Sequence, residues 1–197
     1  MLRHSLIAAA TVAALVTAAP VAAQQAAAGG ALRVAPSGRA TTAVSLTPPR
    51  VQGQPAATPK VIKIDYGQPH ARGRQVLGTL IIQDSVWRLG ANEATSLTSD
   101  VDLDIGGVAV PAGSYTLFLV HGGDGAKLVV SRKTGQWGTA YEEAQDLARI
   151  PMESRTLTEP VESLAITLVP STQAPAQGVL DIRWGTAAYS VPWKVKS

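Results

Sequence analysis

The clearest structural signal in the sequence is the stretch DVDLDI, which occupies Asp100–Ile105. Successive side chains of a β-strand point to opposite faces of the sheet. In this stretch Val101, Leu103 and Ile105 would therefore share one face, and the three aspartates would share the other. This period of two predicts a strand that is buried on one face and solvated on the other, which is typical of antiparallel sheets.

Further strand signals flank this stretch on both sides. Apolar and polar residues alternate again at residues 180–184 and 189–195, while residues 115–120 and 165–169 are nearly continuous apolar runs. Alternating runs predict half-buried strands, and continuous runs predict central strands that are covered on both faces. The glycine pair at 106–107 separates two apolar runs and predicts a tight hairpin between them.

Together these signals predict an all-β fold. We expect an antiparallel β-sandwich, with an open β-barrel as the alternative. Only Thr139–Leu147 has a helical spacing of residues, and it is short, so we expect at most one short helix. The 197 residues are 46% hydrophobic and 16% charged, which is typical of a globular chain, and they include no Cys to form a disulfide.

The sequence divides into three parts. Residues 1–23 combine a basic start, an apolar run and small residues before Ala23, which predicts a secretory signal peptide cleaved near Ala23. Residues 24–59 are rich in Ala, Thr, Gly and Pro and contain no aromatic or acidic residue, so we predict a disordered tether. Residues 60–197 carry the strand signals and form a single predicted β-sandwich domain.

The leader and the charge balance also bear on location and partners. The apolar run of the leader is shorter than the roughly 20 residues of a membrane span, so we expect no transmembrane segment in a mature protein that is periplasmic or secreted. The chain has 17 Lys and Arg against 14 Asp and Glu, and four of the arginines precede residue 60. The predicted domain thus has no excess of positive charge, which argues against a nucleic-acid partner.

Metal and cofactor motifs are incomplete. The aspartates of Asp100–Ile105 have the spacing of a calcium loop, but Ile105 stands where such a loop needs Gly and Pro111 stands where it needs Glu. Beyond the leader the only histidines are His70 and His121, which are far apart in the sequence and have no Cys to accompany them. We find no phosphate loop, dinucleotide motif or nucleophile elbow, and therefore predict neither a metal nor a cofactor.

Polar and aromatic residues gather in two clusters, Asp65–Arg74 and Val86–Thr95. Guanidinium groups near a carboxylate and a carboxamide can recognise a planar anion, and an aromatic ring can add a stacking face. We therefore expect a site for a sugar, a small anion or a protein partner. The candidate ligand-binding residues are Asp65, Tyr66, Gln68, Arg72, Arg74, Trp87, Arg88, Asn92, Glu93 and Thr95.

Two other interpretations of the clusters stay open. In the first, Arg72, Arg74 or Arg88 pairs with Asp65 or Glu93 inside the fold and only stabilises it. In the second, the protein is a hydrolase that uses Glu93 and Asp65 as acid and base. Our leading hypothesis is a non-catalytic binding module of the cell envelope, whose partner is a small molecule or an envelope protein.

Several motifs resemble those of a bacterial exported family that is catalogued as domain of unknown function 2911. The motifs are Ile64-Asp65-Tyr66-Gly67-Gln68-Pro69, Arg72-Gly73-Arg74, Val86-Trp87-Arg88-x-Gly90-Ala91-Asn92-Glu93-Ala94-Thr95, Pro111-Ala112-Gly113-x-Tyr115 and Gly135-Gln136-Trp137-Gly138. The resemblance covers about residues 60–196. It implies an exported bacterial protein, often a single domain behind a signal peptide, and it assigns no role to any residue.

Overall fold

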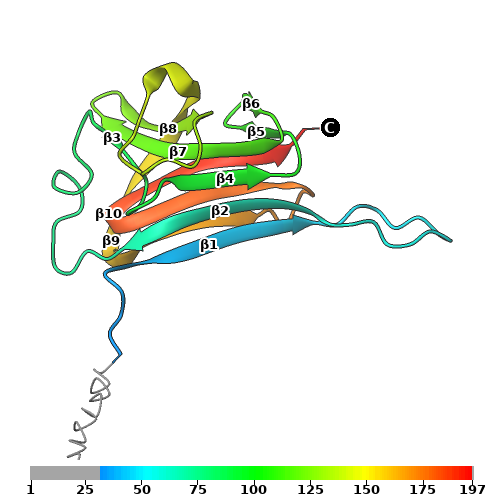
Figure 1. The fold of residues 1–197 in the computed structure, drawn as a ribbon, viewed down its shortest axis with the longest axis horizontal. Coiled ribbons are helices and arrows are strands. Elements are labelled where there is room, and N and C mark those ends of the chain that lie inside the picture. The colour runs from blue at the N-terminus through cyan, green and yellow to red at the C-terminus, as the bar shows by residue number, and fades with distance from the viewer. Residues whose placement is uncertain (1–31, 197) are drawn as a thin grey trace, which may run out of the picture. The chain divides into compact units, whose positions relative to one another are not determined.

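The computed structural model describes residues 32–196, so the predicted signal peptide and residues 24–31 lie outside the described part. The described residues form ten strands and one short 3-10 turn (Figure 1). The elements are β1 (Ser37–Leu46), β2 (Lys60–Pro69), β3 (Val86–Trp87), β4 (Thr95–Ser99), β5 (Leu103–Ile105), β6 (Val108–Val110), β7 (Gly113–Gly122), β8 (Gly125–Ser131), η1 (Glu143–Gln145), β9 (Asp146–Pro170) and β10 (Gln177–Val195). The predicted all-β fold is confirmed, and η1 lies in the segment predicted to be helical.

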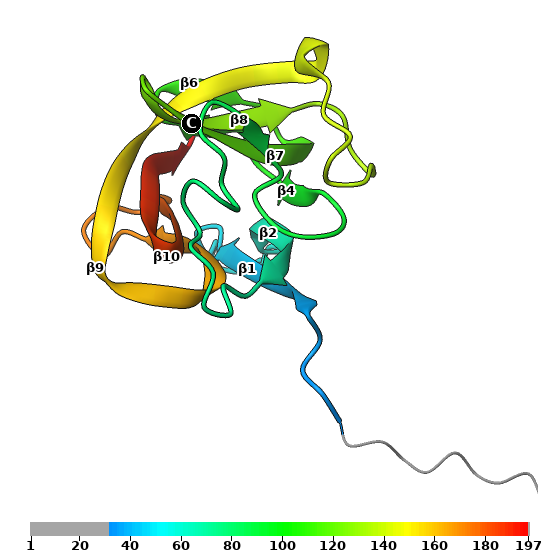
Figure 2. The ribbon, with the colours of Figure 1, turned by 90° about the vertical axis from the view of Figure 1, so that its left-hand side faces the viewer.

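All ten strands belong to one antiparallel sheet that does not close. The order is β1-β2-β4-β7-β8-β9-β10-β5-β6, and β3 pairs with β7 beside this path. The long strand β9 pairs with β8 through residues 146–152 and with β10 through residues 153–170. Because β9 pairs first with β8 and then with β10, the sheet curls around its own core (Figure 2). This open, curled sheet is consistent with the predicted sandwich and with its open-barrel alternative.

Side chains of β2 bridge the gap that the sheet leaves open. The Tyr66 hydroxyl accepts a hydrogen bond from the Ile166 amide at 3.2 Å, and the Gln68 side chain donates one to the Leu164 carbonyl at 2.9 Å. The Ile166 donor and the Leu164 acceptor both belong to β9. Hydrogen bonds from side chains thus join β2 to β9, where no continuous strand ladder does so.

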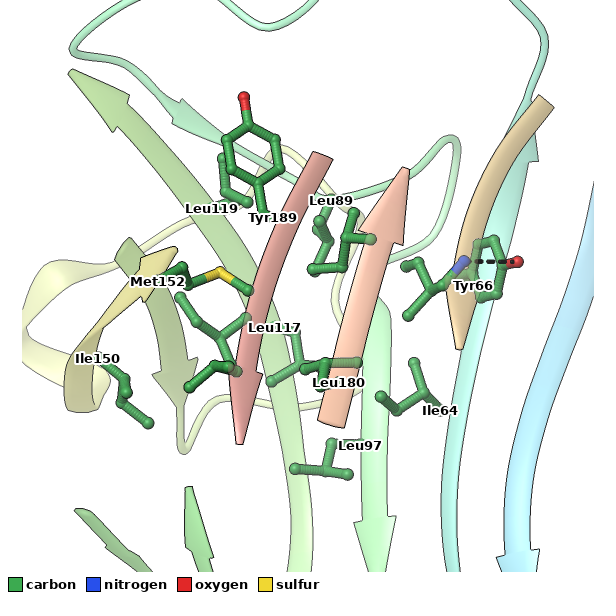
Figure 3. Packing of buried hydrophobic residues seen from close by; sticks show 14 of the residues in the cluster. Ile64, Tyr66, Leu89, Leu97, Leu117, Leu119, Ile150, Met152, Leu180 and Tyr189 are labelled. Carbon is green, nitrogen blue, oxygen red and sulfur yellow. Dashed lines mark hydrogen bonds between the residues drawn. The ribbon is translucent and has the colours of Figure 1, made fainter. Parts of the chain in front are cut away.

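One hydrophobic core fills the curled sheet (Figure 3). Leu117 and Leu119 of β7 point into it together with Ile150 of β9, and all three are fully buried. The stretch Asp100–Ile105 is a strand only over its second half, β5, but its burial alternates as predicted, because Leu103 and Ile105 are buried while Asp104 between them is partly exposed. Burying one large aliphatic side chain contributes about 1.5 to 3 kcal/mol, so this face of the sheet holds the fold together.

The two continuous apolar runs behave differently. Residues 115–120 are covered on both faces, as predicted, because Phe118 is buried on the side opposite Leu117. The prediction for residues 165–169 is wrong: Ile166 and Leu168 are buried, but Val169 is 49% exposed. In this part of β9 the outer face of the sheet has no covering segment among the described residues, so apolar residues there meet solvent.

The predicted tether differs most from the structure. Its residues Ser37–Leu46 form β1, which pairs with β2 along its whole length. Thr42, Val44 and Leu46 are partly buried, and the residues between them are exposed. Because of this alternation, a segment without aromatic residues can cover one edge of the sheet. The prediction of a tether rested on composition, which does not show a period of two. No helix among residues 32–196 is long and apolar enough to cross a membrane.

Candidate functional site

The two predicted clusters lie in direct backbone contact. The Ala91 amide donates a hydrogen bond to the Gly67 carbonyl at 3.1 Å. A side chain at Gly67 would place its Cβ only 1.9 Å from the Ala91 carbonyl oxygen, so only glycine fits at this point. The contact brings the end of β2 and the connection between β3 and β4 to the same end of the curled sheet.

A cavity of about 410 Å³ opens at this end. Figure 2 looks onto the same end, where the connection of residues 70–85 passes in front of the strands. Four of the ten predicted site residues line the cavity, namely Arg74, Trp87, Arg88 and Asn92. The cavity has the volume of an ordinary small-molecule site, which ranges from about 300 to 1,000 Å³.

Two pairs of aromatic rings form much of the cavity wall. Trp87 stacks on Trp184 of β10, with ring centroids 5.6 Å apart and an angle of 16° between the planes. Phe118 of β7 meets the edge of Tyr141 at a centroid distance of 5.0 Å. Of these four rings the sequence predicted only Trp87, because the other three come from distant segments that only the fold brings together.

Arg74 is held in a fixed position beside the cavity. Its Nε donates to the Ala71 carbonyl at 2.9 Å, and one terminal nitrogen donates to the His70 carbonyl at 2.7 Å. Both acceptors are neutral, so the charge of the guanidinium is not cancelled by them. A guanidinium has five N–H donors, and these two bonds leave others free to meet a ligand.

Arg88 contributes the second positive charge. Its aliphatic stem packs under the neighbouring connection, where a Cβ at Gly138 would lie 2.8 Å from the Arg88 Cδ. None of the ion pairs formed by the described residues includes Arg74 or Arg88. None of the described residues that line the cavity is an Asp or a Glu. The cavity wall is therefore electropositive.

Asn92 and Thr95 shape the connection that carries Arg88. Asn92 adopts a left-handed backbone conformation with φ of 63°, which Asn tolerates better than most residues, and its side chain donates to the Ser37 carbonyl at 3.4 Å. The buried Thr95 hydroxyl donates to the Leu89 carbonyl at 2.8 Å. Asn92 thus lines the cavity and anchors its loop to β1, whereas Thr95 supports the loop from behind.

Asp65 and Glu93 share an ion-pair partner, Arg39, which lies in the predicted tether. Arg39 of β1 pairs with Asp65, and its Nη1 lies 3.3 Å from the Glu93 carboxylate. The Thr41 hydroxyl also donates to Asp65 at 2.7 Å. The interpretation that Arg72, Arg74 or Arg88 pairs with these acids is wrong, because β1 supplies the partner instead. Neither acid is among the described residues that line the cavity.

The other candidates also lie away from the cavity. Tyr66 and Gln68 direct their polar groups to β9, as described above, and so serve the fold. Arg72 has a left-handed backbone with φ of 51°, and its amide donates to the Glu162 side chain at 2.7 Å while its own side chain is exposed. The structure therefore brings four of the ten candidates together around the cavity and leaves six outside it.

Tyr141 is held by its hydroxyl group. The hydroxyl donates to Asp146 at 2.7 Å and accepts a hydrogen bond from Arg149 at 2.7 Å. Burial, and then the hydrogen bond to Asp146, raise the pKa of Tyr141 above its ordinary value, so the phenol stays neutral. Its ring is thus fixed against Phe118 and offers the cavity an uncharged wall.

No group of three or more His, Cys, Asp or Glu side chains within residues 32–196 has the arrangement of a metal site. A family model described as "Protein of unknown function (DUF2911)" matches residues 48–193, which is more than half of the chain. The match contains every predicted site residue. No curated protein and no solved structure matches the chain.

Proposed function

We propose that this chain, which belongs to the family of proteins of unknown function 2911, is an exported, non-catalytic binding module. It binds a small organic anion in the cavity beside Arg74 and Arg88. The observation that carries the proposal is the charge of the wall: within residues 32–196, Arg74 and Arg88 have no carboxylate partner and no lining residue is acidic. Hydrogen bonds to a charged partner contribute about 1.5 to 3 kcal/mol each, so two arginines can hold an anion selectively.

The beginning of the sequence supports the export part of this proposal. A basic start, an apolar run and small residues before Ala23 have the pattern of a signal peptide. A periplasmic or secreted protein meets metabolites and breakdown products of the envelope that carry negative charge. The module would bind such a molecule outside the cytoplasm.

Isothermal titration of the purified protein with small organic acids tests the anion site. We expect binding that Arg88→Gln weakens by at least about tenfold, which corresponds to the loss of one charge-assisted hydrogen bond of about 1.4 kcal/mol. Arg72→Gln is the matched control, because Arg72 is an exposed arginine on the neighbouring segment and does not line the cavity. Absence of anion binding, or equal losses in both variants, would contradict the proposal.

The alternative hydrolase stays a prediction. Its two carboxylates, Asp65 and Glu93, share Arg39 as an ion-pair partner on the outside of the cavity. Turnover of an ester or glycan that Glu93→Gln abolishes would favour it over a binding module. Neutral sugars that bind without any effect of Arg88→Gln would likewise argue against the anion site.

A further inference from the structure

We propose that the anion bound by this cavity is an aromatic carboxylate, whose ring lies against the half-buried rings of Trp87 and Tyr141 and whose carboxylate lies at the arginines. The inference rests on the proposed function and adds the chemical class of the ligand. It excludes inorganic anions and hydroxyl-rich acids such as sugar acids as preferred ligands.

The aromatic and the charged lining residues differ in exposure. Trp87 and Tyr141 are half-buried and present ring surface to the cavity, whereas Phe118 and Trp184, at 1% and 4% exposed, back these two rings from the core. Arg74 is exposed and Arg88 is half-buried, so the positive charges lie nearer the mouth. A ligand that satisfies both regions has an apolar body and an anionic group at one end.

The aromatic side chains of the lining have few polar groups left for a ligand. The indole N–H of Trp184 already donates to the Glu162 carbonyl at 3.3 Å. The Tyr141 hydroxyl is occupied by Asp146 and Arg149, and Phe118 has no polar atom. A sugar hydroxyl placed against these rings would lose its water without gaining a partner, which is costly. An aromatic ring loses no hydrogen bond there and gains stacking or edge contacts.

The mouth supports the same class of ligand. Ile82 lines the cavity although it is 57% exposed, and Leu80 and Val86 line it nearby. An apolar ligand body would cover part of Ile82 and remove it from water, which is favourable. A volume of about 410 Å³ accommodates a ring with substituents, whereas a simple inorganic anion would leave the aromatic walls unused.

Titration of the wild-type protein with four sodium salts tests the inference: phenylacetate, cyclohexylacetate, glucuronate and acetate. We expect phenylacetate to bind at least about tenfold more tightly than glucuronate and acetate, and severalfold more tightly than cyclohexylacetate, because only an aromatic ring stacks and makes edge contacts. Equal binding of glucuronate and phenylacetate would overturn the inference. Equal binding of cyclohexylacetate would show that the site selects an apolar body and not an aromatic one, which also overturns it.

A pair of tryptophan variants locates the binding. Trp87→Leu should weaken phenylacetate by about tenfold and acetate by a much smaller factor, since it removes one ring of the cavity wall. Trp137→Leu is the matched control, because Trp137 is 53% exposed and does not line the cavity. A similar loss in both variants would contradict the assignment, and the wild-type series decides the ligand class even if Trp87→Leu unfolds.

The two proposals fail in different ways. If glucuronate, acetate and phenylacetate bind equally and Arg88→Gln weakens all three, the anion site stands and the aromatic class is wrong. If no acid binds in a way that depends on Arg88, both the proposed function and this inference are wrong.

Discussion

Gly67 is the residue through which the two polar clusters touch. Its carbonyl accepts the Ala91 amide, and the Cβ of any other residue there would lie 1.9 Å from the Ala91 carbonyl oxygen. Close approach of two backbones in this way requires glycine, and the obstructing atom belongs to the main chain and cannot rotate aside. The cavity depends on this contact, because Arg88 and Asn92 are carried by the connection that it fixes.

Gly67→Ala should therefore destabilise the protein by about 2 to 3 kcal/mol, as expected when an extra carbon is forced into closely packed structure. Urea denaturation of the variant and the wild type measures the difference. Gly38→Ala is the matched control on β1, where no atom of the described residues lies within 4 Å of the added carbon, and we expect a change below about 0.5 kcal/mol. Equal stability of Gly67→Ala and the wild type would show that the two clusters do not pack as described.

Single residues also show which parts of the site the sequence could predict. Arg74, Trp87, Arg88 and Asn92 were identified by polar and aromatic density near turns, and they do surround one cavity. Phe118 and Trp184 were missed because each lies in a strand that reads as ordinary core, and only the curl of the sheet brings them to the cavity. Arg39 was missed for the opposite reason, since its surroundings resemble disordered sequence.

Strand β1 illustrates the same limit at the level of elements. Alternating patterns predicted β5 and β10 because their apolar residues are large, whereas β1 alternates with small residues and Thr, which give a weak signal. Yet β1 pairs with all of β2, and it supplies Arg39 to two carboxylates and Ser37 to the cavity. The element therefore contributes to the fold and to the site.

Removal of β1 should weaken the fold strongly. A chain that starts at Lys60 leaves β2 as an unpaired edge and exposes the apolar residues under Val44 and Leu46, so we expect a loss of at least roughly 3 kcal/mol or no cooperative transition. Thermal unfolding followed by circular dichroism measures this. A chain that starts at Val34 keeps β1 and serves as the control. Identical melting of both chains would support the original prediction of a tether.

At the scale of the whole molecule, one core serves the entire sheet and contains a buried phenol. Tyr189 of β10 lies in this core and is 2% exposed (Figure 3). Its hydroxyl lies 3.2 Å from His121 Nδ1. Burial raises the pKa of Tyr189 to about 12. Because a phenolate at this position would lose its hydration inside the core, ionisation of Tyr189 opposes folding of the whole sheet.

The sign of the resulting pH dependence follows from the two states. Tyr189 ionises near pH 10 in the unfolded chain and near pH 12 in the folded protein. Above pH 10 the folded state thus binds more protons than the unfolded state, and stability falls with rising pH until both are ionised. The contribution is complete below pH 10 and loses about 2 to 3 kcal/mol in total by about pH 12.

Denaturant unfolding at pH 9, 10, 11 and 12 on the wild type and Tyr189→Phe checks this expectation. The variant lacks the hydrogen bond to His121 and should be less stable at pH 9, but its stability should fall less steeply between pH 10 and 12 because it has no phenol to ionise at this position. The remaining slope in the variant includes Tyr141, whose pKa is also raised. Parallel declines in the two proteins would mean that Tyr189 is not buried in the folded state, and the single core around which the sheet curls would need to be revised.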